Sequence, residues 1–232
     1  MHKKLALFFG AILALSVFLS FTTAMLHRQS YNLNYFERSF VRYGIPEDMG
    51  VELGELMTYA VLLTDYLRGE IDSPNTHTTA RGRSGPLYGE REIIHLEDVR
   101  DLFDLSRSIQ SVATLVSLLI AGVALWRKAV AGVARGALLG GLGLVGILAL
   151  VALLAAADFE RYFIIFHELS FSNDLWMLDP NTEFLIRMFP EPFFSGMAGR
   201  IAAALGGCYA AFLAGCFWLT SRGDVARKGR SA

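Results

Sequence analysis

Four long stretches without a single charged residue constrain the fold of this chain more than any other feature. They cover residues 5–26, 109–126, 136–157 and 201–220. A helix needs about 20 mainly apolar residues to cross the roughly 30 Å hydrocarbon core of a bilayer. The composition agrees, since 53% of the residues are hydrophobic and only 19% are charged. The sequence therefore predicts an all-α integral membrane protein with four transmembrane helices.

Basic residues are distributed unevenly among the segments that separate these spans. The N-terminal residues, the 127–135 loop and the 221–232 tail together hold nine Lys and Arg residues and one acid. The 27–108 and 158–200 segments hold twelve basic and 21 acidic residues. Cytoplasmic loops of membrane proteins are enriched in Lys and Arg. We therefore expect both termini in the cytoplasm and the two acidic segments outside, where they form a helical extracytoplasmic cap.

The first span allows a second interpretation. Two lysines, an apolar run and the small residues Thr22, Thr23 and Ala24 are also the parts of a secretory signal peptide. The apolar run is longer than the usual 7–15 residues or so of such peptides. We favour a retained membrane anchor, and cleavage is the alternative.

Several classes of chemistry have no support in the sequence. It contains no CxxC pair, HExxH helix, Walker loop or dinucleotide-binding glycine motif, so we expect no metal, nucleotide or other cofactor. The near balance of 21 basic and 22 acidic residues argues against a nucleic-acid-binding protein. No serine lies in a nucleophile-elbow context, so a covalent acyl-enzyme is not expected.

The first outer segment predicts two helices joined by a loop. Pro46, Glu47 and Asp48 are typical of a helix start, and this helix is expected to run to Gly69. Small and polar residues from 71 to 86 predict a loop. Helical periodicity returns from 89 to 105, where His95 lies on an apolar face.

The second outer segment begins as an expected continuation of the third span, with Phe163 and His167 on one face. The aromatic and proline-rich stretch that follows is too short to form a core of its own. It must pack on the first outer segment, on the bilayer or on both. An interfacial belt explains Trp126, Phe193 and Phe194. It does not explain the polar residues between the aromatics.

His95 and His167 are the candidate catalytic residues. An imidazole has an unperturbed pKa near 6.5, so two of them can serve as a general base and a general acid. On periodicity alone, the favoured interpretation of the 89–105 stretch is a surface helix that leads into the second span, with His95 exposed or paired with a carboxylate. Arg200 either extends toward the interface or holds an oxyanion. The candidates for orienting the histidines or binding substrate are Glu92, Asp98, Glu168, Asn173, Asp174, Trp176, Asp179 and Arg200.

Two stretches resemble the signature regions of the lipoprotein intramolecular transacylase family of bacterial membrane proteins. They are "GEREIIHLEDVRDLF" and "FHELSFSNDLWMLDPNTEFLIRMFPEPFF". The second is the more specific, with its histidine, Asn-Asp, Trp, Asp-Pro and Phe-Pro-x-x-Phe-Phe in order. The resemblance extends over most of the chain, since the family also has four spans and an extracytoplasmic cap.

The resemblance implies an acyl transfer within one diacylated lipoprotein at the outer leaflet of the bacterial cytoplasmic membrane. The sn-2 acyl chain of an S-diacylglyceryl cysteine moves to the cysteine's own amine, giving an N-acyl S-monoacylglyceryl lipoprotein. The family uses two histidines, which correspond here to His95 and His167. The sequence does not assign which of them is the base and which is the acid. Trp176, Phe189 and Phe193 would wall the pocket against water. A non-enzymatic membrane protein with a structural or sensory cap and a lipid-ester hydrolase are the alternatives.

Overall fold

The computed structural model of the chain describes residues 1–78 and 84–231, with side chains described as far as Gly223. The chain divides into two compact units. The span unit consists of Met1–Leu26, Ser106–Ala157 and Ile201–Ala232. The cap unit consists of His27–Leu105 and Asp158–Arg200. Three helices contribute residues to both units, and each unit is described separately below.

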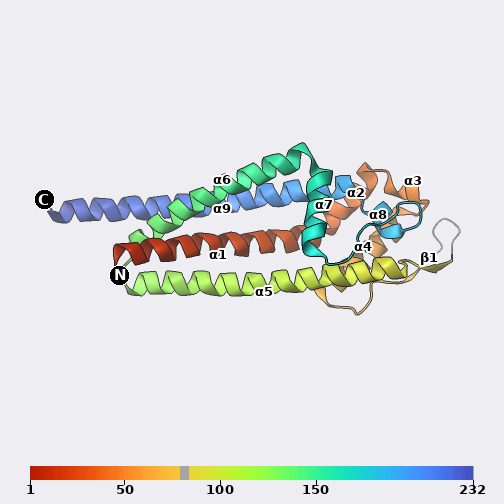
Figure 1. Cartoon of the computed structure of the whole chain (residues 1–232), viewed down its shortest axis with the longest axis horizontal. Helices are drawn as coiled ribbons and strands as arrows, with labels where there is room; N and C mark the ends of the chain where they lie inside the picture. The colour runs from red at the N-terminus through yellow and green to blue at the C-terminus, as the bar shows by residue number, and fades with distance from the viewer. Residues whose placement is uncertain (79–83, 232) are drawn as a thin grey trace. The chain divides into compact units, whose positions relative to one another are not determined.

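The described residues are almost entirely helical (Figure 1). The elements are α1 (Lys3–Ser30), α2 (Leu33–Arg42), α3 (Ile45–Met49), α4 (Leu53–Arg68), β1 (His77–Thr78), β2 (Gly85–Pro86), α5 (Glu90–Trp126), α6 (Val130–Ala157), α7 (Phe159–Ser170), α8 (Phe184–Met188) and α9 (Glu191–Ser231).

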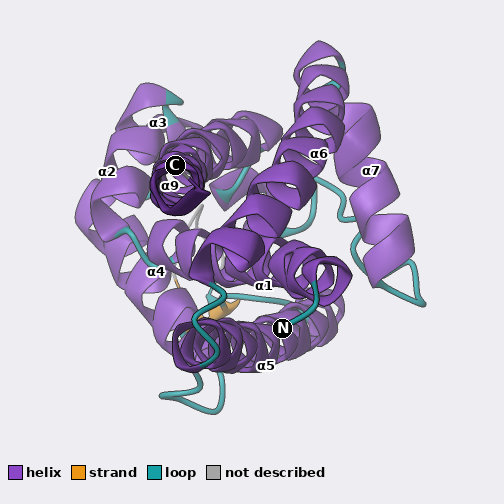
Figure 2. Cartoon of the chain, turned by 90° about the vertical axis from the view of Figure 1, so that its left-hand side faces the viewer, coloured by secondary structure: helices purple, strands orange, loops and turns teal. Residues whose placement is uncertain are grey.

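Four helices are long and apolar enough to cross a membrane, which confirms the predicted fold class. They are α1, α5, α6 and α9, whose most apolar 18-residue windows have mean hydropathies between 1.7 and 2.6. The predicted spans 5–26, 109–126, 136–157 and 201–220 fall inside these helices. In the view of Figure 2 the four helices of the span unit are grouped around one another.

Small residues allow α6 to approach α1 backbone to backbone. A Cβ atom added at Gly136 would overlap the backbone of Leu7, and one added at Gly10 would overlap the backbone of α6 at Val133. Ser117 of α5 donates to the hydroxyl of Ser16 at 2.9 Å. Without a hydrophobic driving force between helices in lipid, close packing of this kind is what holds a bundle together.

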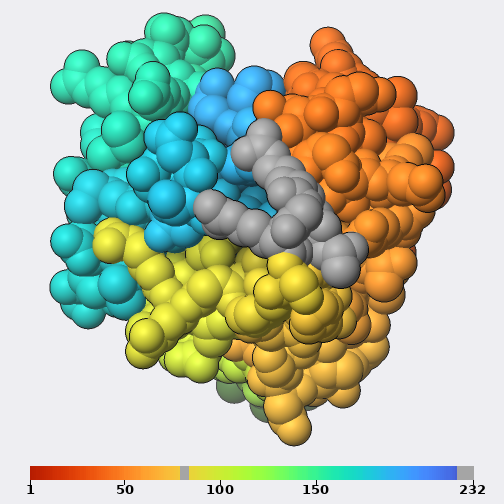
Figure 3. All heavy atoms as spheres, turned by 90° about the vertical axis from the view of Figure 1, so that its right-hand side faces the viewer, coloured from red at the N-terminus to blue at the C-terminus, as the bar shows by residue number. Residues whose placement is uncertain are grey.

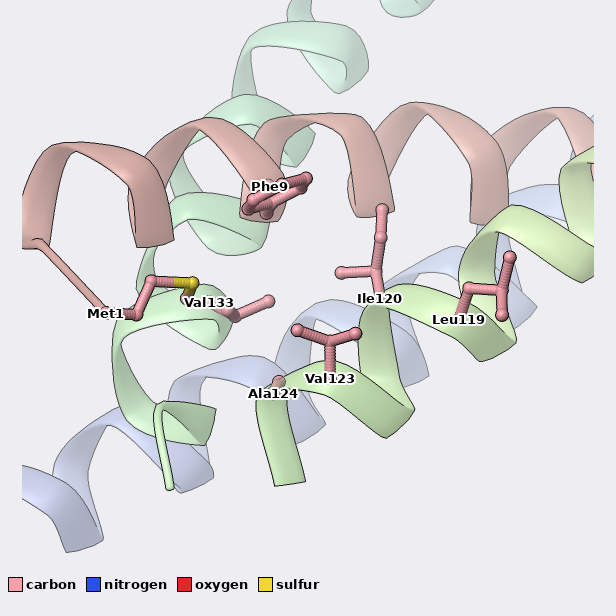
Figure 4. A pocket seen from close by; sticks show the side chains of 7 residues that line it. All are labelled: Met1, Phe9, Leu119, Ile120, Val123, Ala124 and Val133. Atoms are coloured by element: carbon pink, nitrogen blue, oxygen red, sulfur yellow. The ribbon is translucent and has the colours of Figure 1, made fainter. Parts of the chain in front are cut away.

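The span unit also contains an apolar cavity of about 140 Å³ near the start of α1 (Figure 4). Side chains from α1, α5 and α6 line it, and none of them carries a titratable group. This cavity therefore offers no catalytic chemistry. Its lining residues are Met1, Phe9, Leu119, Ile120, Val123, Ala124 and Val133.

Aromatic side chains form much of the core of the cap unit. Phe36 and Phe40 of α2 meet Phe189 and Phe193, with ring centroids 5.1–6.4 Å apart. Tyr35 donates its hydroxyl to the Phe193 carbonyl at 2.6 Å. Aromatic pairs in such tilted and edge-on arrangements contribute beyond the area that they bury. As predicted, the second outer segment packs on the first.

The single helix predicted from Pro46 to Gly69 is wrong, because the chain forms α3 and α4 instead. Gly50 ends α3 in the left-handed region, with φ of 62°. Glu52 is extended, with ψ of 146°, and α4 begins at the next residue. A glycine adopts this left-handed conformation without steric penalty and so terminates helices readily.

Two further expectations need correction. The 158–170 stretch is not a continuation of the third span, because Asp158 leaves helical geometry and caps the separate helix α7 by accepting a bond from Arg161 N–H at 3.1 Å. The expected 71–86 loop contains a short antiparallel pair in which His77 faces Pro86. Residues 79–83 of that loop lie outside the described part of the chain.

Candidate active site

A buried carboxylate fixes the start of the helix that carries His95. Glu92 is 3% exposed and accepts the Gly89 N–H at 2.7 Å, which caps the first turn of α5. Its other oxygen accepts the Leu185 N–H of α8 at 2.6 Å. Burial raises the pKa of Glu92, and the backbone N–H groups of Leu185, Gly89 and Phe184 oppose that rise. One side chain thus joins two helix N-termini, one turn before His95.

His95 lies on the inner side of α5 and is 7% exposed. Its Nδ1 is buried and has no hydrogen-bond partner among the described residues. Burial, and to a smaller extent the neighbouring His167, lower its pKa to about 4, while Asp98 opposes the shift. At neutral pH the ring is therefore uncharged. A neutral imidazole always carries one N–H donor and one acceptor nitrogen.

His167 lies on α7 and is 8% exposed. Its Nδ1 is 2.6 Å from the carbonyl oxygen of Phe163, one turn earlier. A carbonyl can only accept, so Nδ1 must carry the hydrogen, and in the neutral ring the lone pair is on Nε2. Burial lowers the pKa of His167, while the bond to Phe163 acts against this. The helix thus selects the tautomer that a general base requires.

The two histidines face each other within the cap unit. Their ring centroids are 6.1 Å apart with an interplanar angle of 35°. Phe171 contacts both rings, at 5.2 Å from His95 and 5.5 Å from His167. A hydrogen bond spans about 2.7–3.2 Å between heavy atoms. One small functional group between the rings could therefore contact both.

Aromatic side chains surround His167 on several sides. The nearest ring centroids are those of Phe163 at 4.4 Å, Trp176 at 5.0 Å and Phe166 at 5.3 Å. Trp176 was predicted to wall the pocket, whereas the sequence did not single out Phe166 or Phe171. Phe171 lies four residues after His167, which is the helical spacing that could have revealed it.

Phe189 and Phe193 were also predicted to wall the pocket, and this is wrong. Both lie in the aromatic core with Phe36 and Phe40. Their only chain of ring contacts toward the histidine among the described residues runs through Phe194, which is 5.1 Å from Phe163.

Asn173 ties the loop that follows α7 to α5. Its side-chain amide donates to Asp98 at 2.8 Å, and its side-chain oxygen accepts the Leu175 N–H at 3.0 Å. Its backbone carbonyl accepts the indole N–H of Trp176 at 3.0 Å. One residue thus connects the helix of His95 with the indole that covers His167. Asp98, Asn173 and Trp176 were all candidates from the sequence, and the structure brings them together.

Arg91 makes a second link between α5 and the same loop. Its guanidinium donates to the backbone carbonyl of Asp174 at 2.6 Å, and its buried Nε has no partner among the described residues. Arg91 was not among the candidates, although its position four residues before His95 offered a signal. Asp174 takes part through its backbone, and its side chain is exposed.

Three other candidates lie apart from the histidines. Glu168 is exposed, and no described contact links it to either ring. Asp179 shapes a turn, because its carboxylate accepts bonds from the backbone and side-chain amides of Asn181. Arg200 is exposed, with its guanidinium 4.9 Å from the ring of Tyr35.

A cavity of about 790 Å³, lined by both polar and apolar residues, adjoins the first turn of α5. Gly89, Arg91 and Glu92 line one side of it, and Thr182, Glu183 and Phe184 line another. Figure 3 shows this face of the cap unit, where the start of α5 in yellow borders the 171–190 stretch in blue-green. Within the described residues, no group of three or more His, Cys, Asp and Glu could hold a metal ion.

Comparisons with known proteins show the family of the chain. Residues 8–194 match the family described as lipoprotein intramolecular transacylase Lit. The chain belongs to this family. The family name describes an acyltransferase, which confirms the expectation that the protein is an enzyme of that class. No curated protein sequence matches the chain.

Solved structures with the same fold come from the Lit family as well. The membrane-integral lipoprotein intramolecular transacylase Lit from Bacillus cereus superposes with a TM-score of 0.79 at 21% sequence identity, covering 97% of this chain and 100% of that one. A variant of that protein with one histidine replaced by alanine gives a TM-score of 0.71 at 18% identity, covering 96% of each chain. These matches confirm the fold of a multi-pass membrane protein of the Lit family.

Proposed function

We propose that this protein transfers the sn-2 acyl chain of an S-diacylglyceryl cysteine to the free amine of the same cysteine. The substrate is a bacterial lipoprotein, and the product is an N-acyl S-monoacylglyceryl lipoprotein. The observation that carries the proposal is the pair of buried, facing imidazoles in a chain of the Lit family. Both rings are neutral at pH 7, so both are ready to move a proton.

His167 is the general base of this mechanism. Its Nδ1–H is engaged with the Phe163 carbonyl, so its Nε2 lone pair is available to the attacking amine. A terminal amine has a pKa near 8 and becomes acidic as it attacks a carbonyl carbon. A base within hydrogen-bonding distance removes that proton as the carbon–nitrogen bond forms.

His95 is the electrophilic partner. Its low pKa keeps it uncharged, so it stabilises the developing oxyanion by donating an N–H hydrogen bond. In a buried site such a bond is stronger than in water. The departing glyceryl oxygen then receives the proton that the amine lost. One carbon–nitrogen bond forms, one carbon–oxygen bond breaks, and no water is consumed.

The reaction is intramolecular, because the nucleophile and the ester belong to one substrate molecule. Well-oriented intramolecular reactions reach effective molarities of about 10⁵ M or more. The task of the protein is then to fold the lipid into the reactive conformer and to exclude water, which would hydrolyse the ester. Phe163, Phe171 and Trp176 around the pair supply an apolar wall of this kind.

We also propose that the cap unit faces outward and that both termini are cytoplasmic. The excess of Lys and Arg in the N-terminal residues, the 127–135 loop and the 221–232 tail supports this orientation. The protein is then a multi-pass component of the bacterial cytoplasmic membrane, with its histidines at the outer leaflet, where diacylated lipoproteins reside.

The test is mass spectrometry of lipoprotein N-terminal peptides from cells that express His95→Ala or His167→Ala. Removing a general acid or base typically slows a reaction by about 10²–10⁴-fold, so the N-acyl product should fall to background. His77→Ala is the matched control, because His77 is exposed and its described bond is to Ser84. Each variant must still insert at the wild-type level.

Other outcomes separate the alternative functions. Release of free fatty acid with no amide product would show a lipid-ester hydrolase. If both histidine variants give the wild-type acylation pattern, the proposed catalysis is wrong, and a structural or sensory cap becomes the better explanation.

A further inference from the structure

Helix α7 has a row of apolar side chains on the part of its surface that is most exposed. They recur at positions i, i+3, i+4 and i+7, the spacing that aligns side chains along one side of a helix. Leu169 is 83% exposed and Phe166 is 51% exposed. We call this row the apolar side of α7; it consists of Tyr162, Ile165, Phe166 and Leu169.

Another part of the exposed surface of α7 carries charge, and Ile164, 38% exposed, lies beside it. Arg161 and Glu168 are exposed and form the charged side of the helix, and Glu160 is exposed nearer the inner side, seven residues before His167. At 3.6 residues per turn, the apolar side, the charged side and the inner side with His167 are roughly 120° apart. The helix therefore presents three different chemistries to three directions.

The position of α7 in the chain indicates what covers its apolar side. The helix begins at Phe159, and α6 ends at Ala157. The most apolar window of α6 has a mean hydropathy of 2.6, the highest of the four spans. A helix that starts one residue after a span must begin near the bilayer surface. Helices with one apolar and one charged side lie in that surface, and tyrosine is enriched there.

We propose that the apolar side of α7 inserts among the acyl chains of bilayer lipids, so that α7 is an interfacial helix. Its charged side then faces water, and its inner side faces the cap unit at the level of the lipid–water boundary. The consequence for catalysis rests on the proposed function. The ester to be cleaved belongs to a glyceryl lipid, so a histidine held at this boundary meets it without lifting the acyl chains into water.

Contact with lipid can be measured by tryptophan fluorescence in proteoliposomes. In the full chain with Trp126, Trp176 and Trp218 replaced by Phe, Leu169→Trp or Glu168→Trp supplies the only indole. Lipids with brominated acyl chains quench an indole that touches them. We expect at least twofold stronger quenching for Leu169→Trp than for Glu168→Trp, its neighbour on the charged side. Equal quenching, or none for Leu169→Trp, would overturn the proposal.

Covering of the apolar side by a second copy of the chain gives a different result. Leu169→Trp would then escape bromine quenching in concentrated proteoliposomes and become quenched only after dilution with lipid. That outcome also overturns the proposal. Bromine quenching measures contact between the indole and lipid and does not depend on catalysis. It therefore tests the proposal even if the histidine variants disprove the proposed function.

The rate of amide formation tests separately whether insertion of the apolar side of α7 serves catalysis. Leu169→Glu places a charge on the apolar side and should lower the rate of amide formation in proteoliposomes on the order of tenfold, whereas Leu169→Ile should retain it. A wild-type rate for Leu169→Glu would show that insertion of this side does not serve catalysis. Loss of activity in both variants would point to packing within the cap unit instead.

Discussion

The span unit and the cap unit are held together by opposite means. In the span unit, glycines let α1 and α6 meet backbone to backbone, and small hydroxyl groups join helices, as in the bond from Ser117 to Ser16. In the cap unit, large aromatic side chains fill the core, and buried polar groups such as Glu92 and Asn173 bridge segments distant in sequence. The backbone contacts of the span unit hold whole helices together, whereas the aromatic and polar contacts of the cap unit hold individual side chains in position.

This difference follows from the solvent of each unit. Lipid competes with apolar packing, so helices associate through close contact of small residues. An aqueous cap gains from burying aromatic rings and must pair the polar groups that it buries. The proposed catalysis by two histidines needs the second kind of construction, because each ring must be held in one place and in one protonation state.

The largest loss of stability is expected from a larger side chain at the close contact between α1 and α6 in the span unit. Gly136→Ala puts a methyl group onto the backbone of Leu7, and overpacking of this kind costs about 3 kcal/mol. Gly143→Ala is the matched control on the same helix, because a Cβ there meets nothing within 4 Å. Thermal unfolding in detergent should show a midpoint at least about 5 °C lower for the first variant only. Equal midpoints would contradict close α1–α6 packing.

The sequence predicts the span unit better than the cap unit for the same physical reason. Four uncharged stretches of about 20 residues have almost no alternative to crossing a bilayer. Periodicity also put His95 on an apolar helix face and His167 on one face with Phe163, but it did not predict that either ring is buried. It could not show that Gly50 ends α3 or that Asp158 starts a new helix, because each depends on the backbone angles of one residue.

The partners of the histidines were only partly predictable. Asp98 and Asn173 were named as polar candidates near the two signatures, but a bond between residues 75 positions apart has no local signal. Phe189 and Phe193 were assigned to the pocket because aromatic composition does not say which rings pack on each other. Arg91 was missed because a charged residue in a first helical turn usually faces solvent.

An effect of similar size concerns the acid stability of the cap unit. The pKa of His95 is about 4 in the folded chain and 6.5 when unperturbed. As the pH falls from 6.5 toward 4, the unfolded chain binds a proton that the folded chain does not. The free energy of unfolding should therefore fall by about 3 kcal/mol over that window, with no effect above it.

His95→Gln removes this dependence, so its unfolding midpoint should change less between pH 7 and pH 4.5 than that of the wild type. His77→Gln is the control, because His77 is exposed. If all three proteins lose stability in parallel, the acid sensitivity does not come from the buried imidazole. Glu92, whose pKa is raised, is the next group to examine in that case.

A third effect tests the bridge between α5 and α8. Glu92→Gln replaces one carboxylate oxygen with an amide that cannot accept from both Gly89 N–H and Leu185 N–H. Leaving a buried donor unpaired costs about 2 kcal/mol. We expect a lower unfolding midpoint and slower amide formation, whereas Glu90→Gln, an exposed change two residues away, should alter neither. Wild-type stability of Glu92→Gln would show that the carboxylate is not needed as a cap.

The smallest predicted effect separates positioning from stability. Asn173→Ala removes the bond to Asp98 and loosens the loop that carries Trp176, so we expect kcat to fall about tenfold with little change in KM. Asn181→Ala is the control, because the side chain of Asn181 bonds within a turn to Asp179. With Trp126 and Trp218 replaced by Phe, the fluorescence of Trp176 also reports directly on its ring contact with His167.

Protonated imidazole quenches a neighbouring indole, so Trp176 emission should drop as the pH passes below the lowered pKa of His167. In Asn173→Ala that drop should weaken, because the indole no longer holds its place 5.0 Å from the ring. An unchanged titration together with a tenfold lower kcat would show that Asn173 acts on substrate and not through Trp176. An unchanged kcat would show that the contact with Asp98 is dispensable, and that the aromatic packing around His167 suffices to hold it.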